Sequence, residues 1–256
     1  MQLSEPAQAL QKQLQEAQAT LTPFDWQPYL ETLSSMDEAY QLARENFGNQ
    51  QPAAYKVALT SSMAQAAYDY DQPAYGQLMA DQLLTSPGKV NLAEHFGPLL
   101  EVEVGFRVDQ VPSPDDSLEE LLSKLSVVPA VEMPDSRFKD WMRKINKELF
   151  VADNAMANQL LLGPVSKQKF NVDELPDVHM NLWHDDQLVC ESSAEVVLGN
   201  PLKSVQWLVQ KLAEQGHHLE VRQFVTTGLT HKEVMKPGQW RVEYSHDLGT
   251  LTLDVQ

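Results

Sequence analysis

The sequence has little positive charge and no long apolar stretch. Its 256 residues include 36 Asp and Glu against 19 Lys and Arg, which gives a formal net charge of −17. Such a surface repels nucleic acid and anionic membranes, so we expect neither as a partner. Because no run of 18 or more apolar residues occurs, we also expect no membrane-spanning helix.

Cysteine is almost absent as well. The single cysteine, Cys190, cannot form a disulfide within the chain, which is typical of a reducing compartment. The first residues lack the basic start and apolar block of a secretory signal, so we expect a cytoplasmic protein. No His-x-x-x-His or Cys-x-x-Cys spacing occurs, and the sequence therefore does not support a zinc site.

The pattern of the chain predicts an α+β fold. Residues 1–50 are predicted to be a helical region: Ser4 and Pro6 are typical of a helix start, and Ser35 with Glu38 forms a capping box at a second start. Residues 51–256 are predicted to be a β-rich domain. Within this domain we predict a turn at 71–76, a helix from 135 to about 147, one long helix ended by Gly216, and strands that include 219–225. The long helix should pack on a largely antiparallel or mixed sheet.

Residues 99–108 have the period of a strand, with apolar residues on one face and Glu101 and Glu103 on the other. Two carboxylates two positions apart on a strand stand side by side and repel each other. A hard divalent cation, which prefers oxygen ligands, would relieve that repulsion. The alternative is the solvated face of an ordinary amphipathic strand.

Other polar residues interrupt apolar stretches in the same way. Lys56 lies within the strand-like segment 54–60, Glu132 lies near the end of 127–133, and Asp153-Asn154 follows an apolar run. Lys56 is either an edge lysine that faces water or a cation directed into a site. If the three carboxylates converge with this lysine, they form an oxygen site for Mg²⁺ or Mn²⁺ that leaves positions open for substrate.

An ordered set of motifs over roughly residues 35–255 carries a family resemblance. The chain resembles the 2-keto-4-pentenoate hydratase and 4-oxalocrotonate decarboxylase group of the fumarylacetoacetate hydrolase superfamily. The motifs are Tyr55-Lys56-Val57-Ala58-Leu59-Thr60-Ser61, Asp71-Gln72-Pro73 with Tyr75-Gly76, Leu100-Glu101-Val102-Glu103-Val104-Gly105-Phe106, Pro129-Ala130-Val131-Glu132, Asp135-Ser136-Arg137, Ala152-Asp153-Asn154-Ala155, Val197-Leu198-Gly199-Asn200-Pro201-Leu202, Trp207-Leu208, Thr227-Gly228-Leu229-Thr230 and Pro237-Gly238.

The resemblance implies a rolled mixed β-sheet after an N-terminal helical region, usually assembled into homo-oligomers or complexed with a related subunit. It implies a Mg²⁺ or Mn²⁺ site and a catalytic lysine, which match Glu101, Glu103, Glu132 and Lys56. It also implies substrate-binding positions, which match Asp153, Asn154, Thr227 and Gly228.

The activity that the resemblance implies belongs to aromatic catabolism. A metal-dependent hydratase would add water to a 2-hydroxy-2,4-dienoate, or its 2-keto-4-enoate tautomer, to give a 4-hydroxy-2-keto acid. The alternatives are a 4-oxalocrotonate-type 2-keto acid decarboxylase and a catalytically silent, metal-binding partner subunit. Hydrolysis of a C–C bond would need a His-Glu pair in the N-terminal half, and the sequence offers no such pair.

Two positions depart from the family pattern. Ala74 stands where the hydratases are expected to have an acid, and Met156 stands where a small hydroxyl residue is usual. Another group would then have to replace the acid in proton transfer. The candidates by residue type are Asp69, Asp71, His95 and Asp153.

Overall fold

The structure is a computed structural model that describes residues 2–46, 48, 50–141 and 145–256. Its α-helices in this part of the chain are α1 (Glu5–Thr20), α2 (Met36–Glu45), α3 (Ser62–Ala67), α4 (Leu118–Ser123), α5 (Lys147–Ala152) and α6 (Leu202–Glu214). Its strands are β1 (Ala54–Ala58), β2 (Ala74–Leu78), β3 (Leu83–Thr85), β4 (Gly88–Val90), β5 (Leu99–Val108), β6 (Leu125–Met133), β7 (Gln159–Leu162), β8 (His179–His184), β9 (Gln187–Ser193), β10 (Phe224–Thr226), β11 (His231–Val234), β12 (Gly238–Tyr244) and β13 (Gly249–Val255). No described helix has the length and hydropathy needed to cross a membrane.

The larger of two sheets is organised around β5. Its strand order is β2-β1-β10-β5-β6-β7-β3, and β11 also pairs with β5. One edge of β5 pairs with β6, and the other edge is shared between β11 near its start and β10 near its end. The sheet is mixed, since β1 with β10 and β3 with β7 are parallel and the other pairs are antiparallel.

This sheet is rolled, so that strands distant in its order meet across its interior. Ala54 of β1 and Leu78 of β2 belong to one buried cluster with Val128 of β6 and Leu160 of β7, although β10 and β5 lie between them in the sheet. The predicted α+β fold with a rolled mixed sheet is therefore confirmed.

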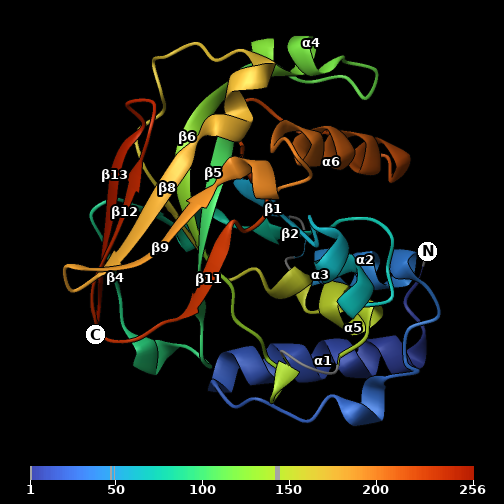
Figure 1. The fold of residues 1–256 in the computed structure, drawn as a ribbon. Helices are drawn as coiled ribbons and strands as arrows, with labels where there is room; N and C mark the ends of the chain where they lie inside the picture. The colour runs from blue at the N-terminus through green and yellow to red at the C-terminus, as the bar shows by residue number, and fades with distance from the viewer. Residues whose placement is uncertain (1, 47, 49, 142–144) are drawn as a thin grey trace.

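A second sheet packs on the outside of the roll, in the order β4-β13-β12-β8-β9. The Tyr244 hydroxyl of β12 lies 2.7 Å from the carbonyl oxygen of Ala130 and 3.1 Å from that of Glu103, which fastens β12 to β6 and β5. In Figure 1, β12 and β13 lie on the side of the roll away from α1, α2, α3 and α5. The predicted long helix is α6. The ring centroid of its Trp207 lies 6.5 Å from that of Tyr75 in β2.

Helix capping follows the sequence, with one difference. The Ser4 hydroxyl accepts a hydrogen bond from Ala7 at the start of α1, and the Ser35 hydroxyl accepts one from Glu38 at the start of α2. Glu38 does not return the bond to Ser35 as the capping box predicts. Its carboxylate accepts hydrogen bonds from the amides of Ser34 at 2.9 Å and Ser4 at 3.1 Å. It therefore ties the start of α1 to the start of α2.

The helix predicted from 135 to about 147 is wrong over residues 135–140. There the backbone pairs with Phe24: the Phe24 amide donates to the Arg137 carbonyl at 3.1 Å, and the Lys139 amide donates back to Phe24 at 3.0 Å. These long-range bonds replace helical ones. Residues 142–144 of that prediction lie outside the described residues, and α5 begins at Lys147.

Two further element predictions are wrong in part. The strand predicted over 219–225 begins only at Phe224, because a turn with Arg222 at φ +77° precedes it. Gly76 lies within β2 rather than in a turn, and a Cβ there would lie 2.1 Å from the carbonyl oxygen of Asn154. Close backbone contact therefore explains this glycine. The division into residues 1–50 and 51–256 stays a prediction.

Glu38 should make stability depend on pH. The Ser34 amide bond and the Ser4 bond lower its pKa from 4.5 to about 2, against an opposing effect of burial. A carboxylate with a lowered folded-state pKa stabilises the fold above its unfolded pKa and loses that contribution as the pH falls. Urea unfolding of the wild type and Glu38→Gln should therefore give a gap at pH 6 that shrinks toward pH 2. A gap that stays constant over this range would contradict the role of the carboxylate charge.

Candidate metal centre and active site

The structure brings the three predicted metal ligands together inside the roll. Glu101 of β5 pairs directly with Glu132 of β6, and Glu103 lies two positions farther along β5 on the same face. One carboxylate oxygen from each of these glutamates lies within 4.8 Å of the others. Glu103 and Glu132 are 0% exposed and Glu101 is 8% exposed, so the alternative of a solvated strand face is wrong.

Lys56 belongs to the same cluster. Its Nζ lies 3.1 Å from Oε1 of Glu132, and the residue is 2% exposed, so the alternative of an edge lysine in water is wrong. The lysine reaches this place because β1 pairs in parallel with β10, which pairs with β5. Lys56 is therefore one strand removed from β5 but shares the interior face of the roll with the glutamates.

The cluster holds more negative than positive charge. Burial raises the pKa of Glu101 to about 7, and the charge of Glu132 adds to the effect while Lys56 and Lys232 oppose it. Burial, followed by Glu132 and Glu101, raises the pKa of Glu103 well above its usual value. Burial by itself would lower the pKa of Lys56. The charges of Glu132 and of the other two carboxylates outweigh this effect, so the pKa of Lys56 lies above its usual value. Each carboxylate is thus costly to ionise without additional positive charge.

The oxygen atoms of the cluster fit a hard divalent cation. Oε1 of Glu103 and Oε2 of Glu132 are buried without a hydrogen-bond partner among the described residues. Unsatisfied buried carboxylate oxygens are destabilising, and a set of carboxylates is typical of Mg²⁺ or Mn²⁺ binding. Oε2 of Glu103 accepts a hydrogen bond from the Gly228 amide at 2.9 Å, which fixes the direction of that side chain.

Gly228 and Thr227 lie beside this cluster. Gly228 has φ +105°, and a Cβ on it would lie 2.1 Å from Oγ1 of Thr60, so only glycine fits there without rearrangement. The Thr227 hydroxyl donates to the Val104 carbonyl at 2.8 Å. Their substrate-binding roles stay predictions.

Asp153 and Asn154 make other contacts. The Asp153 carboxylate is buried in an ion pair with Arg137 and accepts a hydrogen bond from the Ser136 hydroxyl at 2.8 Å. The Asn154 side chain accepts from the Gln77 amide at 2.8 Å and donates to the Gln77 carbonyl at 2.7 Å. These bonds hold the segment after α5 against β2 and Arg137. Their substrate-binding roles also stay predictions.

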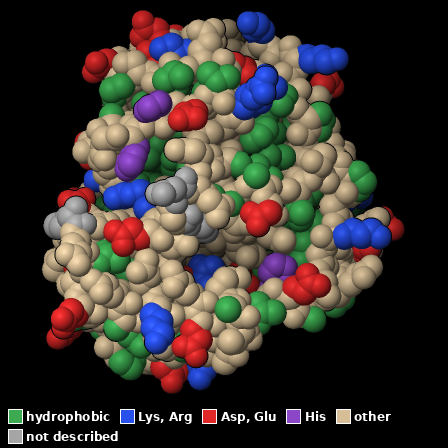
Figure 2. All heavy atoms as spheres, turned by 180° about the vertical axis from the view of Figure 1, so that it is seen from behind, with side chains coloured by type: hydrophobic (Ala, Val, Ile, Leu, Met, Phe, Trp, Pro, Cys, Tyr) green, Lys and Arg blue, Asp and Glu red, His purple; other side chains and the backbone are tan. Residues whose placement is uncertain are grey.

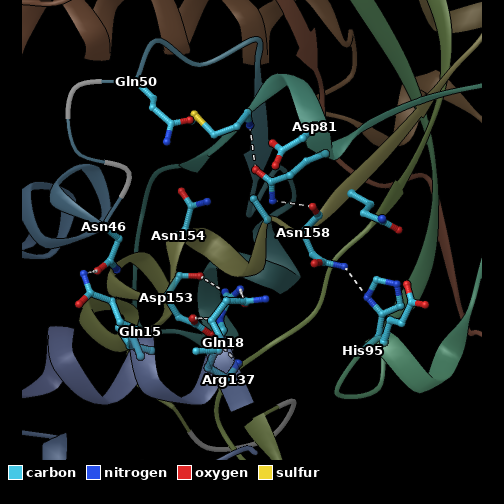
Figure 3. Close-up of a pocket in the computed structure, with 17 residues that line it drawn as sticks. Gln15, Gln18, Asn46, Gln50, Asp81, His95, Arg137, Asp153, Asn154 and Asn158 are labelled. Carbon is cyan, nitrogen blue, oxygen red and sulfur yellow. Dashed lines mark hydrogen bonds and ion pairs between the residues drawn. The ribbon is translucent and has the colours of Figure 1, made fainter. Parts of the chain in front are cut away.

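Asp153 and Asn154 line a separate cavity of about 580 Å³, together with residues of α1 and of the segments after β2 and β4. Figure 3 shows Gln15 and Gln18 of α1 on one side of it and His95 with Asn158 on another. In Figure 2, which views the molecule from behind, the surface is hollowed beside a basic and a histidine side chain. None of the residues lining this cavity is a member of the glutamate cluster.

The residues that could replace the acid expected at position 74 lie in different places. Ala74 is 0% exposed and pairs with Ala58, so its position in β2 is apolar. Asp69 and Asp71 line a cavity next to Lys147. Nδ1 of His95 lies 3.2 Å from Nδ2 of Asn158, in the wall of the larger cavity.

Sequence reasoning missed three residues near the cluster. Thr226 pairs with Lys56, and its hydroxyl is buried without a hydrogen-bond partner among the described residues. Tyr68 lies near enough to Glu101 for that charge to raise the pKa of its phenol, after burial, to about 12. Lys232 pairs with Glu101 across β11 and β5. No signal in the sequence could have found Lys232, because β11 is a short strand without apolar alternation.

Comparison with known proteins adds curated relatives. No family model matches the chain. It is 30% identical to a 2-keto-4-pentenoate hydratase of Paraburkholderia xenovorans (strain LB400) over 188 residues, which cover 72% of this chain and 68% of that protein. It is 27% identical to a 4-oxalocrotonate decarboxylase of Pseudomonas sp. over 188 residues, 72% of this chain and 70% of that protein.

Solved structures share the fold. A 4-oxalocrotonate decarboxylase from Pseudomonas putida G7, complexed with magnesium and adipate, superposes with a TM-score of 0.86 at 24% identity over 100% of this chain and 99% of that one. A fumarylpyruvate hydrolase from Pseudomonas aeruginosa, in complex with Mn²⁺ and pyruvate, gives a TM-score of 0.57 at 13% identity, over 80% and 89% of the two chains.

The glutamate cluster should make stability depend on Mg²⁺. A ligand that binds only the folded state at 100 times its Kd stabilises it by about 2.7 kcal/mol. We expect Mg²⁺ to raise the melting temperature of the wild type and to leave that of Glu103→Ala unchanged. Glu119→Ala, at an exposed glutamate on α4, is the matched control and should keep the shift. A shift that persists in Glu103→Ala would place the Mg²⁺ site elsewhere.

Proposed function

Because the chain belongs to the 2-keto-4-pentenoate hydratase/4-oxalocrotonate decarboxylase family, with the fumarylacetoacetate hydrolase fold, we propose that it is a divalent-metal-dependent hydratase of 2-hydroxydienoic acids. The product would be a 4-hydroxy-2-keto acid. The observation that carries the proposal is the buried cluster of Glu101, Glu103 and Glu132 next to Lys56.

The proposed ligands are the three glutamates, and Mg²⁺ or Mn²⁺ is the proposed ion. When bound, the ion would supply Lewis-acid chemistry for the carboxylate and 2-oxygen of the substrate. The amide of Gly228 holds Glu103 in place for this task. Glu103 and Glu132 are fully buried, which limits competition from bulk water for these interactions.

Lys56 is the proposed catalytic residue. Its ammonium is buried and held beside the carboxylates by Glu132, where it would stabilise negative charge that develops on the substrate oxygen. In the net reaction the 2-hydroxyl loses its proton and C5 gains one, which gives the 2-keto-3-enoate. The oxygen of water then forms its bond to C4, and C3 takes a proton. A lysine ammonium carries three N–H donors on a flexible stem, and Lys56 is the proposed group for a proton transfer of this kind.

Decarboxylation is a second candidate, and Ala74 favours it. The position is apolar and fully buried, so the structure has no carboxyl group there to assist the addition of water. When the remote carboxylate of a 2-keto-3-enedioic acid leaves as CO₂, the electron pair of the broken C–C bond moves through the conjugated chain to the 2-oxygen, and Lys56 would stabilise that charge in the same way. The dienolate then takes up one proton.

The test is the ultraviolet absorbance of freshly generated 2-hydroxypenta-2,4-dienoate with purified protein, with and without Mg²⁺. A Mg²⁺-dependent loss of the dienol band that yields 4-hydroxy-2-ketopentanoate supports the hydratase. Release of CO₂ from a 2-keto dicarboxylic analogue, with no hydration, would replace it with the decarboxylase. Neither reaction, with Mg²⁺ binding intact, would indicate a silent metal-binding subunit.

Lys56→Met should lower kcat by about 10²- to 10³-fold in whichever reaction is found, the usual cost of removing one donor to a developing oxyanion. The matched control is Lys89→Met, which removes an exposed lysine of β4. Because Lys56→Met also leaves Glu132 unpaired, folding is checked by circular dichroism with Mg²⁺ present. A folded Lys56→Met with full kcat would contradict the catalytic role.

A further inference from the structure

The cavity beside α1 is lined largely by side-chain amides. Its volume of about 580 Å³ lies within the usual range for small-molecule sites. Its amides come from segments far apart in the sequence and include Gln15, Gln18, Asn46, Gln82, Asn154 and Asn158. In Figure 3, Gln15 and Asn46 lie on one side of the cavity and Asn158 lies on the other. A ligand here would therefore meet neutral polar groups from several parts of the fold.

Several of these amides are held in place by the backbone. Both ends of the Asn154 amide are bonded to the backbone of Gln77. Oε1 of Gln82 accepts a hydrogen bond from the Met79 amide at 2.8 Å, and its Nε2 donates to the Asn158 carbonyl at 2.7 Å. Side chains that are already fixed lose little freedom when a ligand binds, so this wall is preorganised.

The cavity offers neither sign of charge to a buried ion. Arg137 and Asp153 are 8% and 2% exposed, and they neutralise each other in an ion pair. Burial lowers the pKa of His95, so its ring is uncharged at neutral pH. The other charged residues among the described lining are Asp81 and Glu94, which are exposed carboxylates. An anion would be repelled here, and a cation would find no unpaired carboxylate on the buried side.

Two groups in the wall lack a good hydrogen-bond partner. Oε1 of Gln159 is buried without a partner among the described residues. Nη1 of Arg137 reaches Oε1 of Gln18 at 3.4 Å, which is longer than a usual hydrogen bond. Buried polar atoms without partners are destabilising. A ligand that carries both donors and acceptors would serve both, with a donor to Gln159 after rotation of its amide and an acceptor to Arg137.

Hydroxyl groups match this lining. A hydroxyl donates and accepts through one atom, and a side-chain amide also offers both functions without charge. We propose that the cavity beside α1 is a second ligand site that binds a neutral polyhydroxylated compound, either a sugar or a linear polyol. The site is separate from the glutamate cluster, because none of the residues lining it belongs to that cluster.

The experiment uses three probes on one carbon skeleton. D-sorbitol and D-gluconate differ only at one end, where a hydroxymethyl group replaces a carboxylate, and D-glucose is the ring form. Binding to the full chain is measured by saturation-transfer NMR titration, with and without Mg²⁺. Melting temperature is not the readout, because polyols stabilise folded proteins in general through exclusion from the surface.

The wild type should bind D-sorbitol or D-glucose saturably, with a Kd on the order of 1 mM. The preferred one of the two identifies the ligand as a linear polyol or a sugar. D-gluconate should bind at least about 10-fold more weakly, because its carboxylate meets the negative lining. Mg²⁺ should leave these affinities unchanged, since the cavity lies apart from the glutamate cluster.

Three variants locate the binding. Ala19→Phe, at an exposed position in the last turn of α1, places a ring in the cavity and should abolish saturable binding. Gln159→Met removes the amide at similar size and should weaken binding about 10-fold, the upper effect of one hydrogen bond. Because it also removes an unsatisfied buried oxygen, its melting temperature should not fall. Gln168→Met, at an exposed glutamine outside the cavity, is the matched control.

Four results would overturn the second site. They are no saturable binding of either neutral compound, binding of D-gluconate as tight as that of D-sorbitol, unchanged binding in Ala19→Phe, and binding that requires Mg²⁺ and is lost in Glu103→Ala. The last result would place these compounds at the glutamate cluster. The proposed function is independent of all four, since it is tested with the dienoate, and Ala19→Phe should keep the Mg²⁺-dependent stabilisation that shows it is folded.

Discussion

The architecture depends on the burial of three carboxylates against one lysine. Glu101, Glu103 and Glu132 share the interior of the roll with Lys56, and their oxygens are close enough to repel one another. A buried charge without a partner is strongly destabilising, so this cluster is tolerable only where opposite charge is supplied. The fold supplies part of that charge through Lys56, and the remaining deficit is what suits the interior of the roll to a divalent ion.

The surrounding backbone fits closely around that cluster. Gly228 turns at a positive φ so that its amide meets Glu103, and Gly76 lets the segment after α5 lie directly against β2. On the outer face, Tyr244 holds the second sheet to the strands that carry the glutamates. The positions of the ligands are thus fixed from both faces of one sheet, which keeps four charged side chains from relaxing away from one another.

The charges around the glutamate cluster differ between Glu132 and Glu101. Lys56 is buried beside Glu132, whereas Glu101 lies near Tyr68 and opposite the exposed Lys232. The larger cavity beside α1 has a different character, because Arg137 is already neutralised by Asp153 and amide side chains line it.

Local sequence was sufficient wherever neighbouring residues decide the structure. Alternation predicted β5 at its observed bounds, and Ser4 and Ser35 predicted the starts of α1 and α2. The family resemblance also singled out Glu101, Glu103, Glu132 and Lys56, which the structure brings together. Where distant partners decide, local patterns failed: residues 137–139 pair with Phe24 instead of forming a helix, and Glu38 binds Ser4 across 34 positions.

What the sequence determined by itself is therefore the strand that carries the first two glutamates, the helix starts, the fold class and, by resemblance, the family. Only the tertiary structure decided that Glu132 and Lys56 reach those glutamates in a buried site, that Asp153 is bound to Arg137, and that Lys232 stands opposite Glu101. The reason is physical. Periodicity records which face of a strand is apolar, whereas strand order and register, which set the distances between charges, arise from packing across the whole roll.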